Sequence, residues 1–197
     1  MSDDPKAKAT RVVTGVCRLF YLNVLKPKAN DQGDMKFSTM ILVKKDDKDT
    51  LKRVHAAIEA GKRAYERKFN GGALISDEDW KQLHTPMRDG DKECAVDIKK
   101  DKDLRGHYFF NASSDNKPGL VDKDLNSVTD AAQIYSGMFG RVDVNFYPFR
   151  NKKKGVAAGL NHIQKIRDGE PKMGAGAPEA AFNRYEDNSD EDGDVTF

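Results

Sequence analysis

The chain has 197 residues, among them 34 lysines and arginines and 32 aspartates and glutamates, which give a formal net charge of +2. This length suits one domain of ordinary size with short tails. No stretch approaches the roughly 20 consecutive apolar residues of a membrane-spanning helix, and the first residues lack the apolar segment of a secretory signal, so we expect no membrane partner. The composition also excludes collagen, coiled-coil and disulfide-scaffold proteins. Cys17 and Cys94 are expected to be buried, reduced thiols.

The charge is divided unequally along the sequence. Six of the 32 acidic residues and no basic residue lie in residues 186–197, so residues 1–185 carry 34 basic and 26 acidic residues, a net charge of +8. A block of like charge with little apolar content is typical of a disordered interaction segment. We therefore expect a disordered N-terminus over residues 1–9, a folded domain over 10–170, and a flexible linker with an acidic, disordered tail over 171–197.

The first half of the domain predicts a hairpin followed by a helix. Residues 11–27 are rich in Val, Leu, Phe and Tyr without helical spacing, and residues 36–45 alternate apolar and polar side chains, so both are expected to be strands. Residues 50–69 place apolar side chains on one face of a helix that ends at the Asn-Gly-Gly sequence of residues 70–72. Asp49 or Thr50 is expected to cap this helix.

The second half predicts short strands. Ser76 is expected to cap a short helix that carries Trp80, and residues 93–100, 107–114 and 140–149 have the alternation of strands. Residues 116–129 are expected to form a loop, and the glycines after residue 154 favour a bulged strand over a helix. About six strands, interrupted by one or two helices without repeating strand–helix units, predict a mostly β protein with a small, mostly antiparallel barrel.

No motif for catalysis is present. The sequence lacks a P-loop and a dinucleotide-binding fingerprint, and its four histidines lack zinc-ligand spacing to either cysteine. The pairs Asp89/Asp91 and Asp101/Asp103 could bind the metal of a nuclease, although such residues in Asp/Lys/Gly loops usually form solvated turns. We therefore expect a protein that is not an enzyme and has no metal and no cofactor.

Aromatic residues beside basic residues on strands are the more specific pattern. Rings can stack on unpaired bases and cations can neutralise phosphates, which are the two requirements for binding a single strand. The candidate DNA-binding residues are Lys36, Phe37, Arg105, Tyr108, Phe109, Arg141, Tyr147, Phe149, Arg150, Lys152, Lys153 and Lys154. Apolar or small neighbours two positions away favour a core position for Phe37, Phe110 and Phe146. For Phe109, Tyr147 and Phe149 both alternatives stay open.

Two segments resemble a known family. Residues 135–149 (YSGMFGRVDVNFYPF) and 154–170 (KGVAAGLNHIQKIRDGE) are similar to tailed-phage proteins, formerly of unknown function, that are associated with single-stranded DNA binding. The turn at 87–91 and the loop at 117–122 are similar as well, and the resemblance spans residues 10–170. The resemblance implies an OB-fold with a long inserted segment. It implies that the protein coats single-stranded DNA without strong sequence preference. It also implies a role in phage DNA replication or recombination, in the cytoplasm of the infected bacterial host.

The tail has a likeness of its own. Bacterial and phage single-stranded DNA-binding proteins share a tail of acidic residues that ends with an aromatic residue. The DGDVTF ending here is similar, although it lacks the proline of the bacterial DIPF ending. The likeness implies that replication or recombination proteins bind the tail. The residues expected to bind them are Asp190, Glu191, Asp192, Asp194 and Phe197.

Other classes stay open beside DNA binding. One is a metal-dependent nuclease that uses the aspartate pairs. The other is a phage assembly or interaction protein that binds no DNA, in which the strands only form sheet and the tail provides solubility. Self-association into a homo-oligomer is also left open by the sequence.

Overall fold

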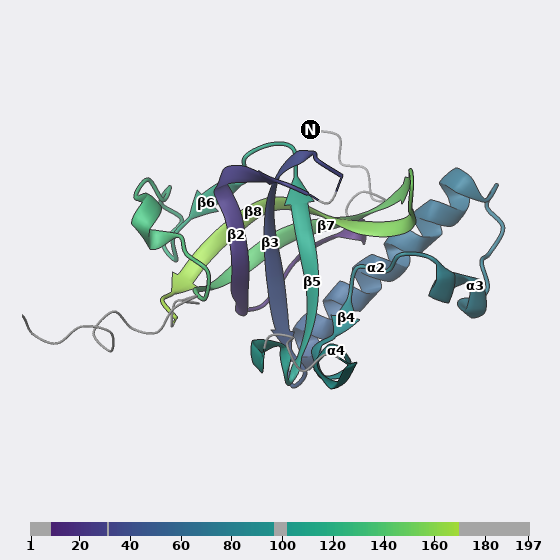
Figure 1. Cartoon of the computed structure of the whole chain (residues 1–197), viewed down its shortest axis with the longest axis horizontal. Coiled ribbons are helices and arrows are strands. Elements are labelled where there is room, and N and C mark those ends of the chain that lie inside the picture. The colour runs from purple at the N-terminus through teal and green to yellow at the C-terminus, as the bar shows by residue number, and fades with distance from the viewer. Residues whose placement is uncertain (1–8, 31, 97–101, 170–197) are drawn as a thin grey trace, which may run out of the picture.

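The computed structural model describes residues 9–30, 32–96 and 102–169 (Figure 1). No helix in these ranges is long and apolar enough to cross a membrane. The strands are β1 (Arg11–Val13), β2 (Cys17–Ala29), β3 (Met35–Lys44), β4 (Arg88–Asp89), β5 (His107–Ser114), β6 (Gly119–Val121), β7 (Phe139–Arg150) and β8 (Lys154–Arg167). The helices are α2 (Lys48–Phe69), α3 (Asp77–Gln82) and α4 (Gly90–Val96), with short 3-10 turns at Lys102–Leu104 and Ala131–Gln133.

Five of the strands close into a ring in the order β2-β3-β5-β8-β7, because β7 pairs with both β2 and β8. Within the ring β5 and β8 are parallel, and the other neighbours are antiparallel. This is the strand order of a five-stranded Greek-key OB fold. Within the described strands, however, β2 meets β7 only at Cys17 and Arg18. The mostly β, OB-like prediction is therefore confirmed, while the predicted barrel is a sheet ring with open sides.

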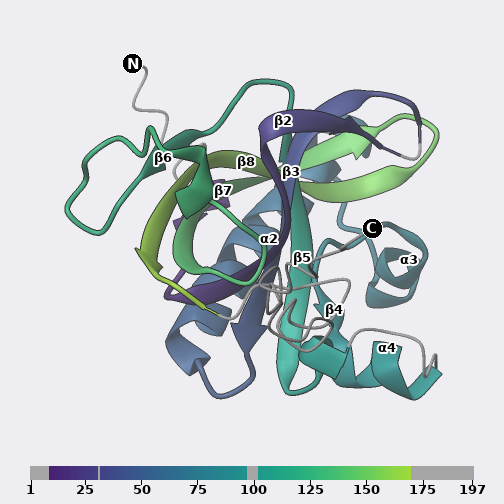
Figure 2. The ribbon, with the colours of Figure 1, turned by 60° about the vertical axis from the view of Figure 1, so that its left-hand side comes forward.

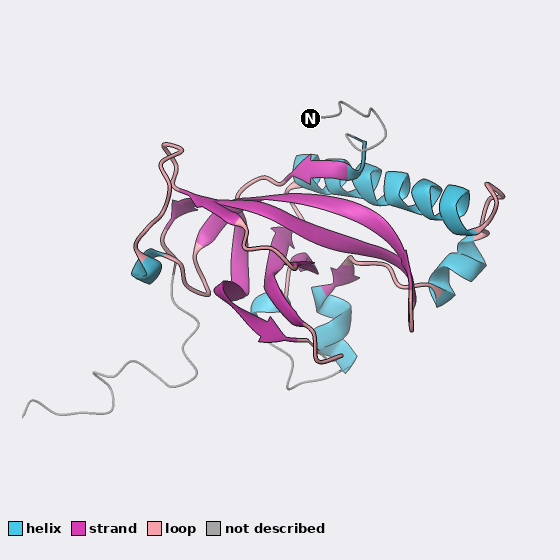
Figure 3. Cartoon of the chain, turned by 90° about the horizontal axis from the view of Figure 1, so that it is seen from above, coloured by secondary structure: helices cyan, strands magenta, loops and turns pink. Residues whose placement is uncertain are grey.

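Side chains are buried on both faces of this sheet. Ile41 and Phe110 point into the ring, where they pack with Phe146 and the apolar face of α2. Their neighbours Leu42 and Phe109 point to the opposite face, because successive side chains of a strand alternate. That second cluster is covered by α4 and the adjoining 3-10 turn. We call the face that carries Leu42 and Phe109 the outer sheet face. On the other face, α2 runs along β7 and β8 (Figure 3).

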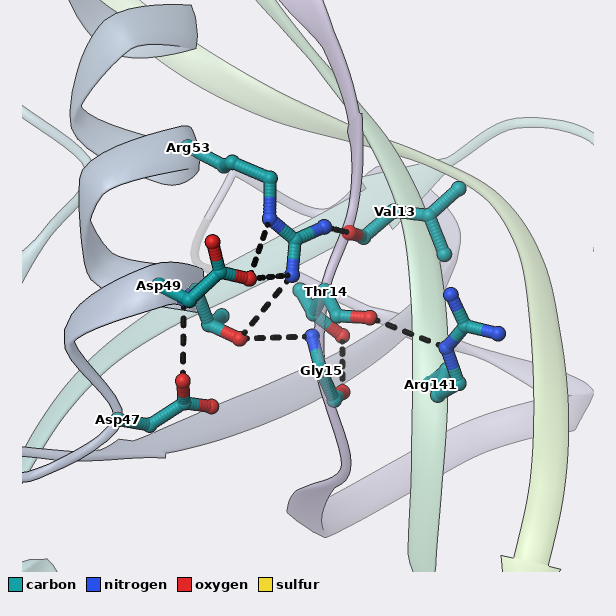
Figure 4. A network of polar contacts seen from close by, with 8 residues as sticks. Val13, Thr14, Gly15, Asp47, Asp49, Arg53 and Arg141 are labelled. Atoms are coloured by element: carbon teal, nitrogen blue, oxygen red, sulfur yellow. Dashed lines mark hydrogen bonds and ion pairs between the residues drawn. The ribbon is translucent and has the colours of Figure 1, made fainter.

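The helix α2 begins earlier than predicted. It starts at Lys48, because Asp47, and not Asp49 or Thr50, is the cap: its side chain accepts a hydrogen bond from the Thr50 amide at 3.0 Å. The hydroxyl of Thr50 instead accepts a hydrogen bond from the Gly15 amide at 2.9 Å, which ties the β1–β2 turn to the helix (Figure 4). This turn also divides the single strand predicted over residues 11–27 into β1 and β2.

Two further segments differ from prediction. Residues 90–96 form the helix α4, whereas a strand was expected over 93–100, of which 97–100 lie outside the described residues. The loop expected over 116–129 contains β6, which pairs in parallel with β8. Local alternation cannot anticipate either result, because each depends on a partner that is distant in sequence.

The predicted bulged strand is confirmed as β8, but neither of its two register shifts against β7 has a glycine of β8 as the extra residue, and the shift near the end of the strand leaves Ile166 unpaired with β7. Val144 pairs with Leu160 and the preceding Asp143 pairs with His162, so Asn161 is the extra residue. The short helix α3 is capped by Ser76 as predicted, and Trp80 is buried against Tyr65.

Candidate nucleic-acid interface

A cavity of about 340 Å³ opens on the outer sheet face over β2, β3 and β5. Its lining includes Tyr21, Asn23, Lys36, Met40, Asn111 and Ser113. We call this cavity the outer groove. It lies beside the part of the same face that α4 covers, because Met40 packs at the edge of the Leu42 and Phe109 cluster. Sequence analysis identified only Lys36 of this set.

Tyr21 is an exposed ring in this groove. Its side chain is 51% exposed, and its φ of +50° is uncommon for a residue with a Cβ atom. The register of β2 against β3 shifts between Phe20 and Asn23, so Tyr21 sits in an irregular part of the strand. In sequence it is one aromatic residue within an apolar run. No local pattern marks it, because the irregularity arises from strand pairing.

The β7–β8 hairpin carries the predicted aromatic residues Tyr147 and Phe149 on the same side of the ring as the outer groove. Tyr147 is 40% exposed and lies close enough to Lys36 of the outer groove to contribute to that lysine's raised pKa. Phe149 is half-buried and packs edge-on against His84, with ring centroids 5.7 Å apart. Figure 2 shows the β2–β3 and β7–β8 hairpins on one side of the molecule. The β2–β3 hairpin therefore lines the outer groove, and the β7–β8 hairpin lies beside it.

Positive charge gathers at this hairpin. Arg150, Lys152, Lys153 and Lys154 are all exposed at its tip. The pKa of His84 is lowered, first by burial and then by the charges of Lys153 and Arg88. A phosphate bound near Lys153 and Arg88 would offset the effect of their charges on His84. Lys36 forms an ion pair with Asp115, which is the main cause of its raised pKa.

Burial of Phe109 and the direction of Tyr108 place these two predicted residues of β5 outside the outer groove. Phe109 is 2% exposed and lies in the core cluster of the outer face, beneath the Arg88 guanidinium at 4.4 Å from its ring centroid, so it has no ring face for a base. Tyr108 alternates to the other face, where it packs near His55 of α2 and Lys45. Neither ring is placed to stack on DNA in the outer groove.

Three more predicted residues do not join the groove. Phe37 is half-buried and shares the ring-facing side of β3 with Ile41. Arg105 is exposed just before β5 begins, at the end opposite Ser113. Arg141 lies at the start of β7, and its Nε donates to the Thr14 carbonyl at 3.3 Å (Figure 4). The DNA-binding prediction therefore divides into a cluster around Lys36 and the β7–β8 hairpin and a set of dispersed residues.

The carboxylates considered as metal ligands bind cations of the protein itself. Lys45 Nζ lies 2.6 Å from Asp89 and 2.7 Å from Asp91, and these contacts are the main cause of the lowered pKa of both carboxyl groups. Asp103 pairs with Arg18, and Asp101 lies outside the described residues. Among the described residues no group of three or more His, Cys, Asp or Glu could hold a metal ion. All of the predicted tail residues, from Asp190 to Phe197, are likewise outside the described part of the chain.

This chain is similar to proteins of several bacteriophages. "Putative protein p50" of Acyrthosiphon pisum secondary endosymbiont phage 1 is 26% identical over 180 residues, which are 87% of this chain and 90% of that protein. The structure of the single-stranded DNA-binding protein from bacteriophage Enc34 in complex with ssDNA is similar with a TM-score of 0.66 at 21% identity, covering 87% of this chain and 97% of that one. The structure of gp2.5, a single-stranded DNA-binding protein encoded by bacteriophage T7, is similar with a TM-score of 0.59 at 13% identity, covering 95% and 98%. These structures share the fold. Because residues 10–195 match the model of the family described as "Enterobacter phage Enc34, ssDNA-binding protein", the chain belongs to that family.

Proposed function

We propose that this chain binds single-stranded DNA along the outer groove, between the β2–β3 and β7–β8 hairpins. The observation that carries this proposal is the exposure of two rings, Tyr21 in the groove that also holds Lys36 and Tyr147 near that lysine. Exposed rings on a sheet face serve as stacking platforms for unpaired bases, and every base has a face to offer. Membership of the Enc34 family supports single-stranded DNA binding by this chain.

Binding on this surface requires both stacking and charge. The net charge of +8 on residues 1–185 is spread over a whole domain, so bulk charge alone gives weak attraction at physiological salt. The exposed lysines of the hairpin tip supply cations that would neutralise phosphates, and stacked rings would add on the order of 1–3 kcal/mol per base. Such contacts read no base edges, which favours coating of the strand without strong sequence preference. Binding of this kind is not an enzymatic function.

The acidic tail is proposed to have two roles. Residues 171–197 have a root-mean-square span of roughly 30 Å if they behave as a flexible chain, which is comparable with the diameter of a domain of this size. The acidic residues can therefore reach the basic surface of their own domain and compete with DNA. When DNA displaces them, Phe197 and the neighbouring carboxylates become available to replication or recombination proteins in the cytoplasm of the infected bacterial host. A terminal ring with its carboxylate suits an apolar pocket with a basic rim.

A comparison of matched single- and double-stranded oligonucleotides at two salt concentrations tests the binding function. We expect the full chain to retard the single strand at much lower protein concentration than the duplex, with a gap that persists at the higher salt. Equal affinity for both forms, collapsing together as salt rises, would indicate charge attraction without stacking and would contradict the proposal. Turnover of labelled DNA with Mg²⁺ or Mn²⁺ would favour a nuclease instead.

A further inference from the structure

A second cavity, of about 530 Å³, opens between the end of β5 and the middle of β8. Three amide side chains contribute to its lining, from Asn116, Asn145 and Asn161, together with the cations Arg11 and Lys117. We call this cavity the amide pocket. The end of β5 contributes to both cavities, since Ser113 lines the outer groove and Ser114 lines the amide pocket.

A row of cross-strand neighbours joins the two cavities over the outer sheet face. Ser38 of β3 pairs with Ser113 of β5, and Ser113 pairs with Gly159 of β8. Gly159 pairs in turn with Asn145 of β7, which pairs with Arg11 of β1. Paired residues of neighbouring strands project to the same face, so these five form one polar path. Its side chains are small until it reaches the amide pocket.

Gly159, at the middle of the polar path, has no side chain to project from the sheet. A Cβ atom at this position would stand 2.6 Å from Asn145 Oδ1, so the amide of Asn145 lies across the strand where a side chain would otherwise be. Gly159 does not have a positive φ, and its backbone would therefore accept alanine. The glycine is thus explained by the approach of the Asn145 amide and not by backbone conformation.

The pocket offers the chemistry of one nucleotide. Each asparagine amide has a carbonyl acceptor and two N–H donors, so it can bond to the edge of any base. Asp143 holds two of the lining side chains, since it accepts from Arg11 Nε at 2.8 Å and from Asn161 Nδ2 at 3.3 Å. The charge of Arg11 is therefore compensated. Lys117 is exposed and has no ion-pair partner in the part of the chain that the structure describes, which leaves it available for a phosphate.

We propose that a DNA strand bound in the outer groove continues over Gly159 into the amide pocket, where the asparagines bind one nucleotide and Lys117 binds its phosphate. This inference rests on the proposed function and extends it to a second subsite. From Ser38 to Arg11 the row crosses four strand spacings, roughly 19 Å at about 4.8 Å each. At about 3.4 Å per nucleotide of a stacked strand this corresponds to roughly six nucleotides, within the range of about 4 to 16 that one OB fold covers.

The test compares short and long oligothymidines on the full chain and on single variants. Fluorescence anisotropy is measured for strands of about 4 and about 12 nucleotides, lengths that fill one cavity or both. Lys117→Ala is expected to weaken binding of the long strand by about tenfold, and to lower its salt dependence by about 0.7 log units per decade of salt, which is one lost phosphate contact. Gly159→Ala, which displaces the Asn145 amide, is expected to weaken the long strand only. Lys123→Ala, on the same β5–β7 connection but paired with Asp124, is the matched control.

The outcomes are separable from failure of the proposed function. If the wild-type chain binds neither strand, the proposed function fails. If it binds both, and Lys117→Ala and Gly159→Ala leave the long strand unaffected or weaken both lengths equally, the second subsite is overturned. Thermal melting of each variant identifies a loss caused by unfolding. In that case Asn116→Ala, on an exposed loop residue of the pocket, replaces the unfolded variant in the same comparison.

Discussion

His84 occupies the space beside Gly155 that a side chain would need. A Cβ atom at Gly155 would stand 2.2 Å from the His84 carbonyl oxygen, and the two residues form a parallel bridge that holds the segment between α3 and β4 against the β7–β8 hairpin. Val156 N–H donates to the same carbonyl at 2.9 Å, and His84 N–H donates to the Lys154 carbonyl at 2.8 Å. The position of the basic hairpin tip therefore depends on a backbone contact that only glycine permits.

Gly155→Ala is expected to destabilise the chain by about 3 kcal/mol or more. The left-handed φ of +143° costs roughly 1–2 kcal/mol for a residue with a Cβ atom, and the clash with His84 adds to this. Urea denaturation measures the change. Gly33→Ala is the control, because Gly33 also has a positive φ but has no atom within 4 Å of the added Cβ. If both variants lose the same free energy of unfolding, the His84 contact has no structural role.

Tyr147→Ala is expected to weaken single-strand binding by roughly 5- to 150-fold, the equivalent of one base stack of about 1–3 kcal/mol. Because the ring is 40% exposed, its removal should change the melting temperature little. Anisotropy at fixed salt measures the affinity, and Tyr147→Phe, which keeps the ring, should bind nearly as the wild type does.

Phe109→Ala provides the opposite pattern. Removal of this buried ring should lower the free energy of unfolding by about 3–5 kcal/mol. The fraction of the variant that remains folded should bind DNA with the affinity of the wild type. If Phe109→Ala lowers affinity without lowering stability, and Tyr147→Ala lowers stability without lowering affinity, the assignment of the two rings is reversed.

The sequence predicts the strands of the ring and the outward direction of Tyr147 on the β7–β8 hairpin, because apolar and polar side chains alternate along these strands. Val142, Val144 and Phe146 alternate with exposed or polar neighbours, so the direction of Tyr147 follows from the pattern. Phe109 defeats the same reasoning, because a strand whose two faces are both covered has no polar side to mark. Whether α4 covers that outer face depends on contacts that no local pattern encodes.

The outer groove illustrates the second limit of sequence patterns. Tyr21, Met40 and Asn111 come from three strands, and only their pairing brings them to one cavity. None of them has a basic neighbour of the kind that drew attention to the hairpin. Sites built from small polar side chains across a sheet have no signature along the chain, since the meaningful spacing is between strands.

The stability of the fold should fall at high pH through Cys17. Burial raises the pKa of this thiol from its ordinary 9.0 to about 12, so the folded chain keeps the proton that the unfolded chain releases. The contribution is fully present below pH 9 and is lost progressively as the pH rises from 9 toward 12. At one pH unit above the unfolded pKa the loss is about 1.4 kcal/mol.

Urea denaturation at several pH values between 8 and 10.5 measures this loss, with Cys17→Ala as the reference that removes the titrating group. Lysines and tyrosines titrate in both proteins, so the difference between the two stability curves isolates the thiol. Parallel curves for wild type and variant would mean that Cys17 is accessible to solvent in the folded chain.

Deletion of residues 186–197 is expected to tighten DNA binding at low salt and to leave it unchanged at high salt. The deleted segment carries six acidic residues and no basic residue, and its competition with DNA for the basic surface is screened by ions. Affinity measured at two salt concentrations for both chains provides the test. A deletion that abolishes binding would assign the tail a direct role in the complex.

The central claim, that the DNA strand lies on the outer sheet face, is tested most directly by photocrosslinking. An oligothymidine with a photoreactive base is irradiated with the full chain, and the crosslinked residues are identified by mass spectrometry. Crosslinks at Tyr21, Met40 or Tyr147 are the predicted result. The exposed face of α2 also carries basic residues, among them Lys52, Arg63 and Lys68. Crosslinks confined to that helix would contradict the account.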